Sequence, residues 1–206
     1  MRTCMNNYSK VFKIFRKKYQ PIPLEAFGKD KYRALVSTIL SSRTKDVVTL
    51  EASNRLFEKA SSLGKLNQLK TGSIQKLIYP VGFYKTKAKH LKKLAEKILT
   101  DFQGRIPNKR NQLMVLPGVG RKTANLVLTR SFGIPAIAVD THVHRISNLL
   151  GWVKTKKPEQ TEIELLKVLP KKYWPDTNRL FVSIGQRYRN KAKLLKFLKE
   201  NNLIRK

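Results

Sequence analysis

The stretch LPGVGRKTAN, residues 116–125, places two glycines two residues apart ahead of a basic pair that opens a predicted helix. Such a sequence fits a nucleotide-binding loop, an ordinary turn between helices, or a DNA-binding hairpin that also carries a nucleophile. A Walker loop needs glycines where this chain has Leu116 and Arg121, and a dinucleotide-binding loop needs a third glycine where it has Thr123. What remains is a pair of helices joined by a tight glycine hairpin.

The glycines of this hairpin suit close contact with an anion. Gly118 and Gly120 let the backbone approach a ligand, and the amides at the start of the next helix point toward it. Such a loop holds a DNA phosphate without reading any base. A similar turn before basic residues recurs at 80–88, PVGFYKTKA, where an ordinary turn with surface lysines explains the pattern equally well.

The composition indicates a folded basic protein with a polyanionic partner. Its 206 residues include 44 Lys and Arg against 13 Asp and Glu, a net charge of +31. A polyanion relieves the self-repulsion of such a charge. Nucleic acid is favoured over a membrane surface or a ribosome, because the basic residues are spread along the chain and no apolar run reaches about 18 residues.

Cysteine and histidine are too few for an obvious cofactor site. The only cysteine is Cys4, which excludes a disulfide and a cysteine-ligated cluster and fits a reducing compartment. A structural zinc site needs about four ligands, whereas the chain has three histidines, His90, His142 and His144. We therefore interpret His142 and His144 as solvated or core residues and expect no metal and no other cofactor.

The apolar pattern is helical almost throughout. The N-terminal segment slightly resembles a transit peptide, but its apolar residues fall at helical spacing and favour a folded amphipathic helix: Tyr8, Val11, Phe12, Phe15 and Tyr19. Further helices are predicted over 35–40, 47–57, 73–78, 87–102, 111–115, 122–132, 141–150, 161–168, 178–188 and 191–203. Turns are predicted at glycines between them, including Gly64 and Gly72. Residues 134–139 are interpreted as a buried connector.

Two residues have side chains that suit catalysis. Lys122 lies in the first turn of a predicted helix, where the positive helix end and Arg121 disfavour a cation and so favour the uncharged amine that a nucleophile requires. A solvated surface lysine is an equally good interpretation of the hairpin alone. Asp140 follows the connector and precedes a helix that begins THVHR, so a capping role would by itself explain it.

Together these segments resemble the helix-hairpin-helix DNA glycosylases, in particular the endonuclease III family. The resemblance rests on LPGVGRKTAN followed by FGIPAIAVDTHVHRISN, and on the spacing from Lys122 to Asp140, which matches the family's nucleophile and its acidic partner. The segments ILSSRTKD at 39–46 and LIYPVGFYKTKAKHLKKL at 77–94 also agree, and the similarity extends to about Gly185.

The resemblance implies an all-α fold of two domains with DNA in the cleft between them. A six-helix domain with the hairpin would span 27–134, and 1–26 would join 135–206 in a second helical domain. A damaged base would be flipped out of the duplex, and Lys122 would attack the sugar C1′ to form a Schiff base that breaks the strand by β-elimination. Asp140 would deprotonate Lys122 or stabilise the developing charge. Relatives that only remove bases lack this lysine.

The resemblance also implies a set of DNA contacts. Phe83 would enter the duplex as an apolar wedge, with a core position as the alternative, and Arg43 would fill the gap left by the flipped base, where the family commonly has glutamine. The remaining expected contacts are Leu116, Gly118, Val119, Gly120, Arg121, Thr123 and His142.

The chain departs from the family where most members begin a four-cysteine iron–sulfur cluster. Arg189 stands at the first cysteine position and no cysteine follows. The cluster is therefore expected to be absent, and the tail from 187 to 206 is predicted to form a basic amphipathic helix.

The expected function is that of a bifunctional DNA glycosylase and AP lyase for oxidised pyrimidines such as thymine glycol. Two alternatives remain open: the same fold acting on 8-oxoguanine, deaminated bases or abasic sites alone, and a non-catalytic helix-hairpin-helix DNA-binding protein. We expect a monomer that binds damaged double-stranded DNA and no membrane, in the cytoplasm at the nucleoid or in a nucleus.

Overall fold

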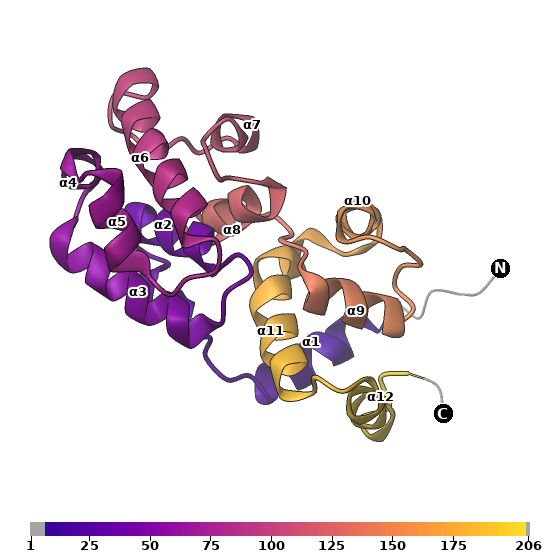
Figure 1. The fold of residues 1–206 in the computed structure, drawn as a ribbon. Helices are drawn as coiled ribbons and strands as arrows, with labels where there is room; N and C mark the ends of the chain where they lie inside the picture. Colours follow the sequence, from indigo (N-terminus) through magenta and orange to yellow (C-terminus); the bar gives the residue numbers. More distant parts are fainter. Residues whose placement is uncertain (1–6, 205–206) are drawn as a thin grey trace. The chain divides into compact units, whose positions relative to one another are not determined.

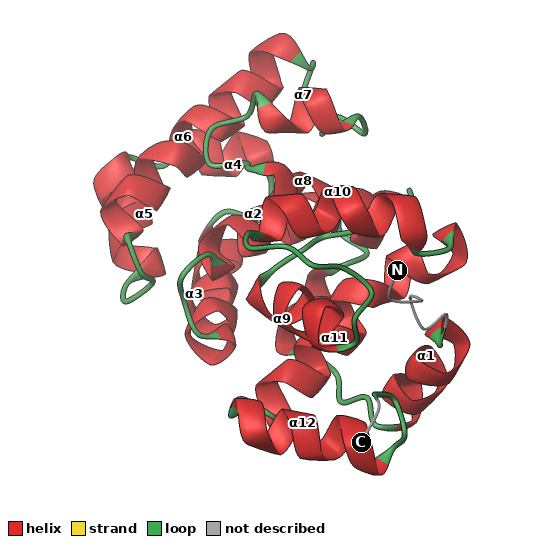
Figure 2. Ribbon diagram, turned by 90° about the vertical axis from the view of Figure 1, so that its right-hand side faces the viewer, coloured by secondary structure: helices red, strands yellow, loops and turns green. Residues whose placement is uncertain are grey.

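The chain folds into helices joined by loops, as the computed structural model in Figure 1 shows. The structure describes residues 7–204, apart from the side chain of Leu24, and contains no strand in that range. Figure 2 shows the same alternation of helices and loops from a second direction. The expected all-α class is confirmed, and no helix among these residues is both long and apolar enough to span a membrane.

The chain divides into two compact units. The central unit is Pro23–Ile134, and the split unit combines Met1–Ile22 with Pro135–Lys206. The first boundary thus lies four residues before the expected residue 27. The reason is the 3-10 helix η1 (Pro23–Phe27), which packs against helices of the central unit.

The central unit contains seven α-helices, one more than the expected six: α2 (Lys31–Ser41), α3 (Asp46–Lys59), α4 (Leu63–Gln68), α5 (Thr71–Ile78), α6 (Tyr84–Asp101), α7 (Arg110–Met114) and α8 (Arg121–Phe132). The prediction of turns at Gly64 and Gly72 was wrong, because α4 and α5 each include their glycine. Helix α4 forms because the Ser62 hydroxyl caps it by accepting from Lys65 N, while Leu63 and Leu66 are buried.

Helix α2 is the core of the central unit. Every residue from Ala34 to Leu40 is buried, and the helix packs against α3, α6 and α8. Its first turn is capped by Asp30, whose carboxylate accepts from Arg33 N at 3.0 Å. Because α2 is enclosed on several sides, the loop that follows it has a fixed starting point.

The split unit contains α1 (Tyr8–Lys17), α9 (Thr141–Leu149), α10 (Pro158–Val168), η2 (Lys171–Tyr173), α11 (Trp174–Arg187) and α12 (Lys191–Glu200). The predicted amphipathic helix at the N-terminal end is confirmed as α1, whose apolar face is buried in an aromatic core. The Phe12 ring stacks on Tyr173 with centroids 4.3 Å apart, and Phe15 meets Phe181 edge-on at 5.1 Å.

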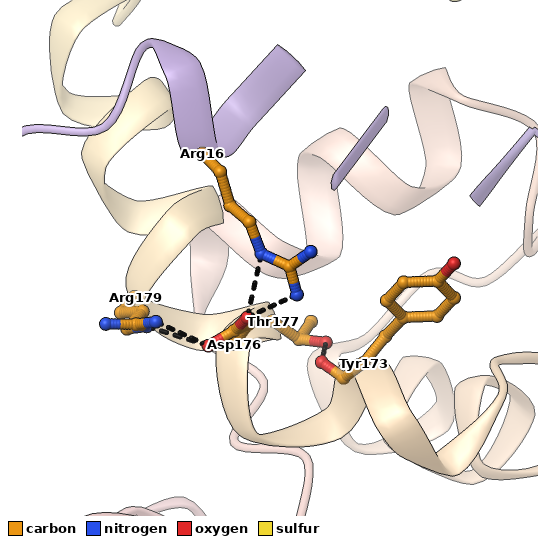
Figure 3. A network of polar contacts seen from close by, with 5 residues as sticks. All are labelled: Arg16, Tyr173, Asp176, Thr177 and Arg179. Atoms are coloured by element: carbon orange, nitrogen blue, oxygen red, sulfur yellow. Dashed lines mark hydrogen bonds and ion pairs between the residues drawn. The ribbon is translucent and has the colours of Figure 1, made fainter. Parts of the chain in front are cut away.

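A charged network fastens α1 to α11 inside the split unit (Figure 3). The Asp176 carboxylate accepts from Arg16 Nη2 at 2.6 Å and from Arg179 Nη2 at 2.6 Å. Burial alone would raise the pKa of Asp176, but the hydrogen bonds and charges of Arg16 and Arg179 outweigh it and lower the pKa below its ordinary value. The same helix turn is held by Thr177, which donates to Tyr173 O at 2.8 Å.

The first and last parts of the described residues, 7–204, are joined in the split unit. Asn7 Nδ2 donates to Leu203 O at 2.7 Å, and Trp152 Nε1 donates to Asn7 Oδ1 at 2.9 Å. The predicted amphipathic helix of the tail is confirmed over Lys191–Glu200 only, because Arg187 ends α11 and residues 201–204 form turns, while 205–206 lie outside the described residues. The buried face of α12 belongs to the core through Leu194, Phe197, Leu198 and the following Leu203.

Candidate active site

The predicted helix-hairpin-helix is confirmed: α7 and α8 pack together on either side of the turn at 115–120. Within the turn, Leu116 N donates to Leu113 O and Val119 N donates to Leu116 O, both at 3.1 Å. The side chains of Leu116 and Val119 are buried. Any contact that these two residues make with DNA must therefore come from the backbone.

The two glycines of the hairpin differ in their surroundings. Gly118 has a φ of +80°, and a Cβ built on it would lie 3.2 Å from both Cβ and Nδ1 of His90. Gly120 has an extended backbone with φ −91°, and a Cβ built on it would meet nothing within 4 Å. The fold itself thus requires glycine at 118 but leaves open space beside 120.

Helix α8 begins without a side-chain cap. Gly120 occupies the capping position and has no side chain, so the first-turn amides of Lys122 and Thr123 have no hydrogen-bond partner within residues 7–204. Arg121 and Lys122 are exposed. Open amides and positive side chains at a helix N-terminus together attract an anion.

The two predicted catalytic residues lie in different units. Lys122 is the second residue of α8 in the central unit, and its register is set by the buried residues 124–128 of that helix. Asp140 caps α9 in the split unit, where Oδ1 accepts from His142 N and Val143 N, both at 2.9 Å. The capping interpretation of Asp140 is confirmed, while Oδ2 has no hydrogen bond among the described residues.

Arg43 and Phe83 lie together at the tips of two loops of the central unit. Both have a left-handed backbone, with φ +53° for Arg43 and +58° for Phe83. The guanidinium carbon of Arg43 lies 5.5 Å from the centre of the Phe83 ring, within reach of a cation–π interaction. The core alternative for Phe83 was wrong, because the residue is 62% exposed.

Sequence reasoning missed Lys87, which lies beneath these tips. Its side chain is buried in α6, and its ammonium donates to the carbonyl oxygens of Leu40 at 2.8 Å and Ser42 at 2.5 Å. Burial lowers its pKa to about 8. The signal was present in the sequence, since Lys87 precedes Leu91 by four residues and shares the apolar face of its helix.

His142 and His144 face different neighbours in the split unit. The ring of His142 lies against Gly185, where an added Cβ would be 2.3 Å from His142 Nδ1. His144 Nδ1 lies 2.6 Å from Thr161 Oγ1 in a hydrogen bond. Within residues 7–204, no cluster of three or more His, Cys, Asp or Glu side chains has the arrangement of a metal site.

The segment after α11 does not fit an iron–sulfur cluster, because the only cysteine of the chain is Cys4. The guanidinium of Arg145 instead donates to the carbonyls of Gly185 at 3.2 Å, Tyr188 at 3.1 Å and Arg189 at 2.5 Å. Tyr188 in turn stacks on Phe197 of α12 with centroids 4.5 Å apart. Hydrogen bonds and aromatic packing therefore close this end of the unit.

Comparison with known proteins agrees with this arrangement. A family model described as HhH-GPD superfamily base excision DNA repair protein matches residues 36–171. Endonuclease III of Thermotoga maritima is 46% identical over 158 residues, which make up 77% of this chain and 74% of that protein. Endonuclease III-like protein 1 of Mus musculus is 42% identical over 159 residues, which make up 76% of this chain but only 53% of the mouse protein.

Two solved structures have the same fold. A non-covalent endonuclease III–DNA complex matches with a TM-score of 0.77 at 28% identity, over 96% of this chain and 98% of that one. A trapped endonuclease III–DNA covalent intermediate, an estranged-adenine complex, matches with a TM-score of 0.75 at 32% identity, over 92% of this chain and 86% of that one. The chain therefore belongs to the HhH-GPD superfamily of base excision DNA repair proteins and, within it, to the endonuclease III family.

Proposed function

We propose that this protein is a bifunctional DNA glycosylase and AP lyase that removes oxidised pyrimidines from duplex DNA. The observation that carries the proposal is the exposed amine of Lys122 in the first turn of α8, directly after a glycine turn and beside helix amides that are open to a phosphate. The similarity to a trapped covalent intermediate between endonuclease III and DNA supports a reaction through a protein nucleophile.

In this proposal the hairpin positions the DNA and the loop tips open it. The open amides of α8 hold a backbone phosphate, which fixes the register of the duplex without reading its sequence. Phe83 wedges between bases, and Arg43 fills the space that the extruded nucleotide leaves. Both residues are exposed and adjacent, as insertion into a duplex requires.

Lys122 then carries out the covalent chemistry. Its uncharged amine attacks C1′ of the damaged nucleotide, the C1′–N bond breaks, and the departing base takes up the proton that the amine loses. The sugar opens to a Schiff base with Lys122. Removal of a proton from C2′ expels the 3′ phosphate and breaks the strand, and water finally releases the lysine.

Asp140 assists the first of these steps through its second oxygen. Because Oδ1 is held by two backbone amides of α9, the carboxylate is fixed and Oδ2 remains available. Oδ2 either accepts the proton of the Lys122 ammonium or stabilises the positive charge that develops on the sugar. At a site that has already lost its base no such charge has to develop at C1′, so cleavage there depends less on Asp140 than base release does.

Borohydride trapping tests the proposal directly. Duplexes that each carry thymine glycol, 8-oxoguanine, uracil or an abasic site are incubated with the protein, and base release, strand cleavage and covalent complex are scored separately. Wild-type protein is expected to release thymine glycol and to be trapped on it, whereas Lys122→Ala does neither. Lys93→Ala is the matched control, because Lys93 is an exposed lysine outside the proposed site.

DNA affinity distinguishes lost chemistry from lost binding. Lys122→Ala should bind duplex DNA nearly as well as wild type, since it removes one of 44 basic residues. Normal trapping by Lys122→Ala would contradict the nucleophile assignment. A wild-type protein that binds DNA but never releases a base or cuts would instead be a non-catalytic DNA-binding member of the superfamily.

A further inference from the structure

The ammonium of Lys87 lies at the centre of a hydrogen-bonded joint in the central unit. Lys87 is 7% exposed, and its Nζ donates to the carbonyl oxygens of Leu40 at 2.8 Å and Ser42 at 2.5 Å. A third bond reaches Thr44 Oγ1 at 3.3 Å. An ammonium has three protons, so every one of them is used on the end of α2 and the loop that follows it.

Thr44 joins this loop to a second one. Its Oγ1 also accepts from Gly82 N at 3.1 Å. A Cβ built on Gly82 would lie only 2.6 Å from the carbonyl oxygen of Arg43, so the two backbones touch and only glycine fits. Residues 42–45 and 80–83, which we call the loop pair, are therefore packed as one piece.

The loop pair holds two residues in an unfavourable conformation. Arg43 and Phe83 both have positive φ, +53° and +58°. Such a backbone is unfavourable for a residue other than glycine and persists only where its surroundings impose it. Lys87 binds the residue on each side of Arg43, namely Ser42 and Thr44, and so fixes the turn at that position.

We infer that Lys87 is a positioning residue for base extrusion: its ammonium locks the loop pair so that Arg43 and Phe83 meet the DNA already assembled as a cation–π pair. The inference rests on the proposed function, because it assigns Lys87 to the step in which the damaged nucleotide leaves the duplex. Lys87 contacts neither the DNA nor the reacting sugar, and it acts only through Arg43 and Phe83 at the two loop tips.

A buried lysine suits this role better than an apolar residue would. An apolar side chain of similar length would leave the buried Leu40 carbonyl and the part-buried Ser42 carbonyl without this donor, and a buried acceptor without a partner is costly. Although burial lowers the pKa of Lys87 to about 8, the group still carries its third proton at neutral pH. Because the loop tips are preassembled, less ordering free energy has to be supplied when the nucleotide is extruded.

The test compares Lys87→Met with Lys93→Met, which removes the same charge from an exposed position on the same helix. Single-turnover base release from a thymine glycol duplex and cleavage of a preformed abasic site are measured for each. We expect Lys87→Met to slow base release by about 10- to 100-fold while slowing abasic-site cleavage by less than about threefold. Lys93→Met should match wild type in both assays.

A double-mutant cycle shows whether Lys87 acts through the loop tips. In a variant that already carries Arg43→Ala and Phe83→Ala, Lys87→Met should slow base release by less than a further factor of about two, because the residues that it positions are gone. The inference would be overturned if Lys87→Met slowed base release by the same factor with and without the two alanines. It would also be overturned if Lys87→Met slowed base release and abasic-site cleavage equally. If Lys87→Met does not fold, Thr44→Val is used instead, because it removes the hydrogen bond to Gly82 from a half-exposed site. Thr44→Val should likewise slow base release more than abasic-site cleavage.

The result with wild-type protein shows whether a failure concerns this inference or the proposed function. A wild-type protein that releases no base from any lesion overturns both. A wild-type protein that releases the base at the same rate as Lys87→Met overturns only the positioning role. A fluorescent 2-aminopurine beside the lesion adds a direct measure, since its signal should rise on extrusion with wild type and rise less with Lys87→Met.

Discussion

Gly118 lies directly against the ring of His90, so that a methyl group at position 118 would be 3.2 Å from the imidazole Nδ1. The contact ties the turn of the hairpin to helix α6 and fixes its shape. Gly120, two residues later, has no such neighbour and an ordinary extended backbone. The two glycines of the hairpin are therefore required for different reasons. The fold requires glycine at position 118, whereas at position 120 we expect the requirement to come from a bound phosphate.

We predict opposite outcomes for alanine at the two positions. Gly118→Ala should lower the free energy of unfolding by about 1–3 kcal/mol, because it combines a positive φ with a close contact. Gly120→Ala should change stability by less than about 1 kcal/mol yet weaken duplex DNA binding, because its methyl group would occupy the space that a phosphate needs. Denaturant unfolding and anisotropy titration measure the two effects, and unchanged affinity in Gly120→Ala would argue against a phosphate at this turn.

Asp140 is predicted to have two separable roles. Asparagine caps a helix about as well as aspartate, so Asp140→Asn should keep its stability while slowing base release strongly and retaining trapping on a preformed abasic site. Asp140→Ala should show the same catalytic loss and also a fall of about 1 kcal/mol in the free energy of unfolding. If Asp140→Asn released bases at the wild-type rate, the carboxylate would be a cap and nothing more.

Arg43 should bias the enzyme toward lesions opposite cytosine. In the gap left by the extruded nucleotide, the guanidinium faces the Watson–Crick edge of the opposite base, and it only donates hydrogen bonds. Cytosine offers two acceptors on that edge, N3 and O2, whereas adenine offers one acceptor beside a donor. We expect base release to be about tenfold faster opposite cytosine than opposite adenine. Arg43→Gln should narrow this difference, since an amide both donates and accepts. The same lesion placed opposite each base provides the measurement, and a ratio unaffected by Arg43→Gln would contradict it.

The Asp176 network predicts a specific loss of stability in acid. Because the folded pKa of Asp176 lies below its ordinary value, the network stabilises the fold above about pH 4, the range of an unperturbed aspartate, and the contribution disappears as pH falls through the folded pKa. Asp176→Asn should cost about 1–3 kcal/mol at pH 7 and progressively less below pH 4. Asp101→Asn is the control, since Asp101 pairs with Lys97 on the surface, and little change is expected.

Helix α12 should contribute to the stability of the split unit. Phe197 is buried between Phe15 and Tyr188, with ring centroids at 6.3 and 4.5 Å. Phe197→Ala is expected to lower the free energy of unfolding by about 3–5 kcal/mol, whereas Lys196→Ala on the exposed face should have little effect. Equal stability of the two variants would show that α12 is not part of the core.

Local sequence patterns predicted most of the helices. Prediction from these patterns failed for features that depend on contacts between residues far apart in the sequence or on burial. The face of Phe12 and Phe15, the hairpin around Gly118 and the cap at Asp140 each depend on neighbours a few residues away, so spacing and residue type were enough. Helix α4 was missed because Gly64 was interpreted as a turn, while burial of Leu63 and Leu66 outweighs its low helix propensity. Lys87 was missed because its acceptors, such as the Leu40 carbonyl, lie 47 residues away.

The hydrogen bond between Asn7 and the Leu203 carbonyl sets an order for folding during synthesis. The central unit is continuous in sequence and can fold as soon as Ile134 has left the ribosome. The split unit needs residues from both of its segments, so α1 must wait for the aromatic partners on and before α11, such as Tyr173 and Phe181, to be translated. During that interval the aromatic face of α1 is without its core, and exposed apolar surface of this kind is what chaperones protect during synthesis.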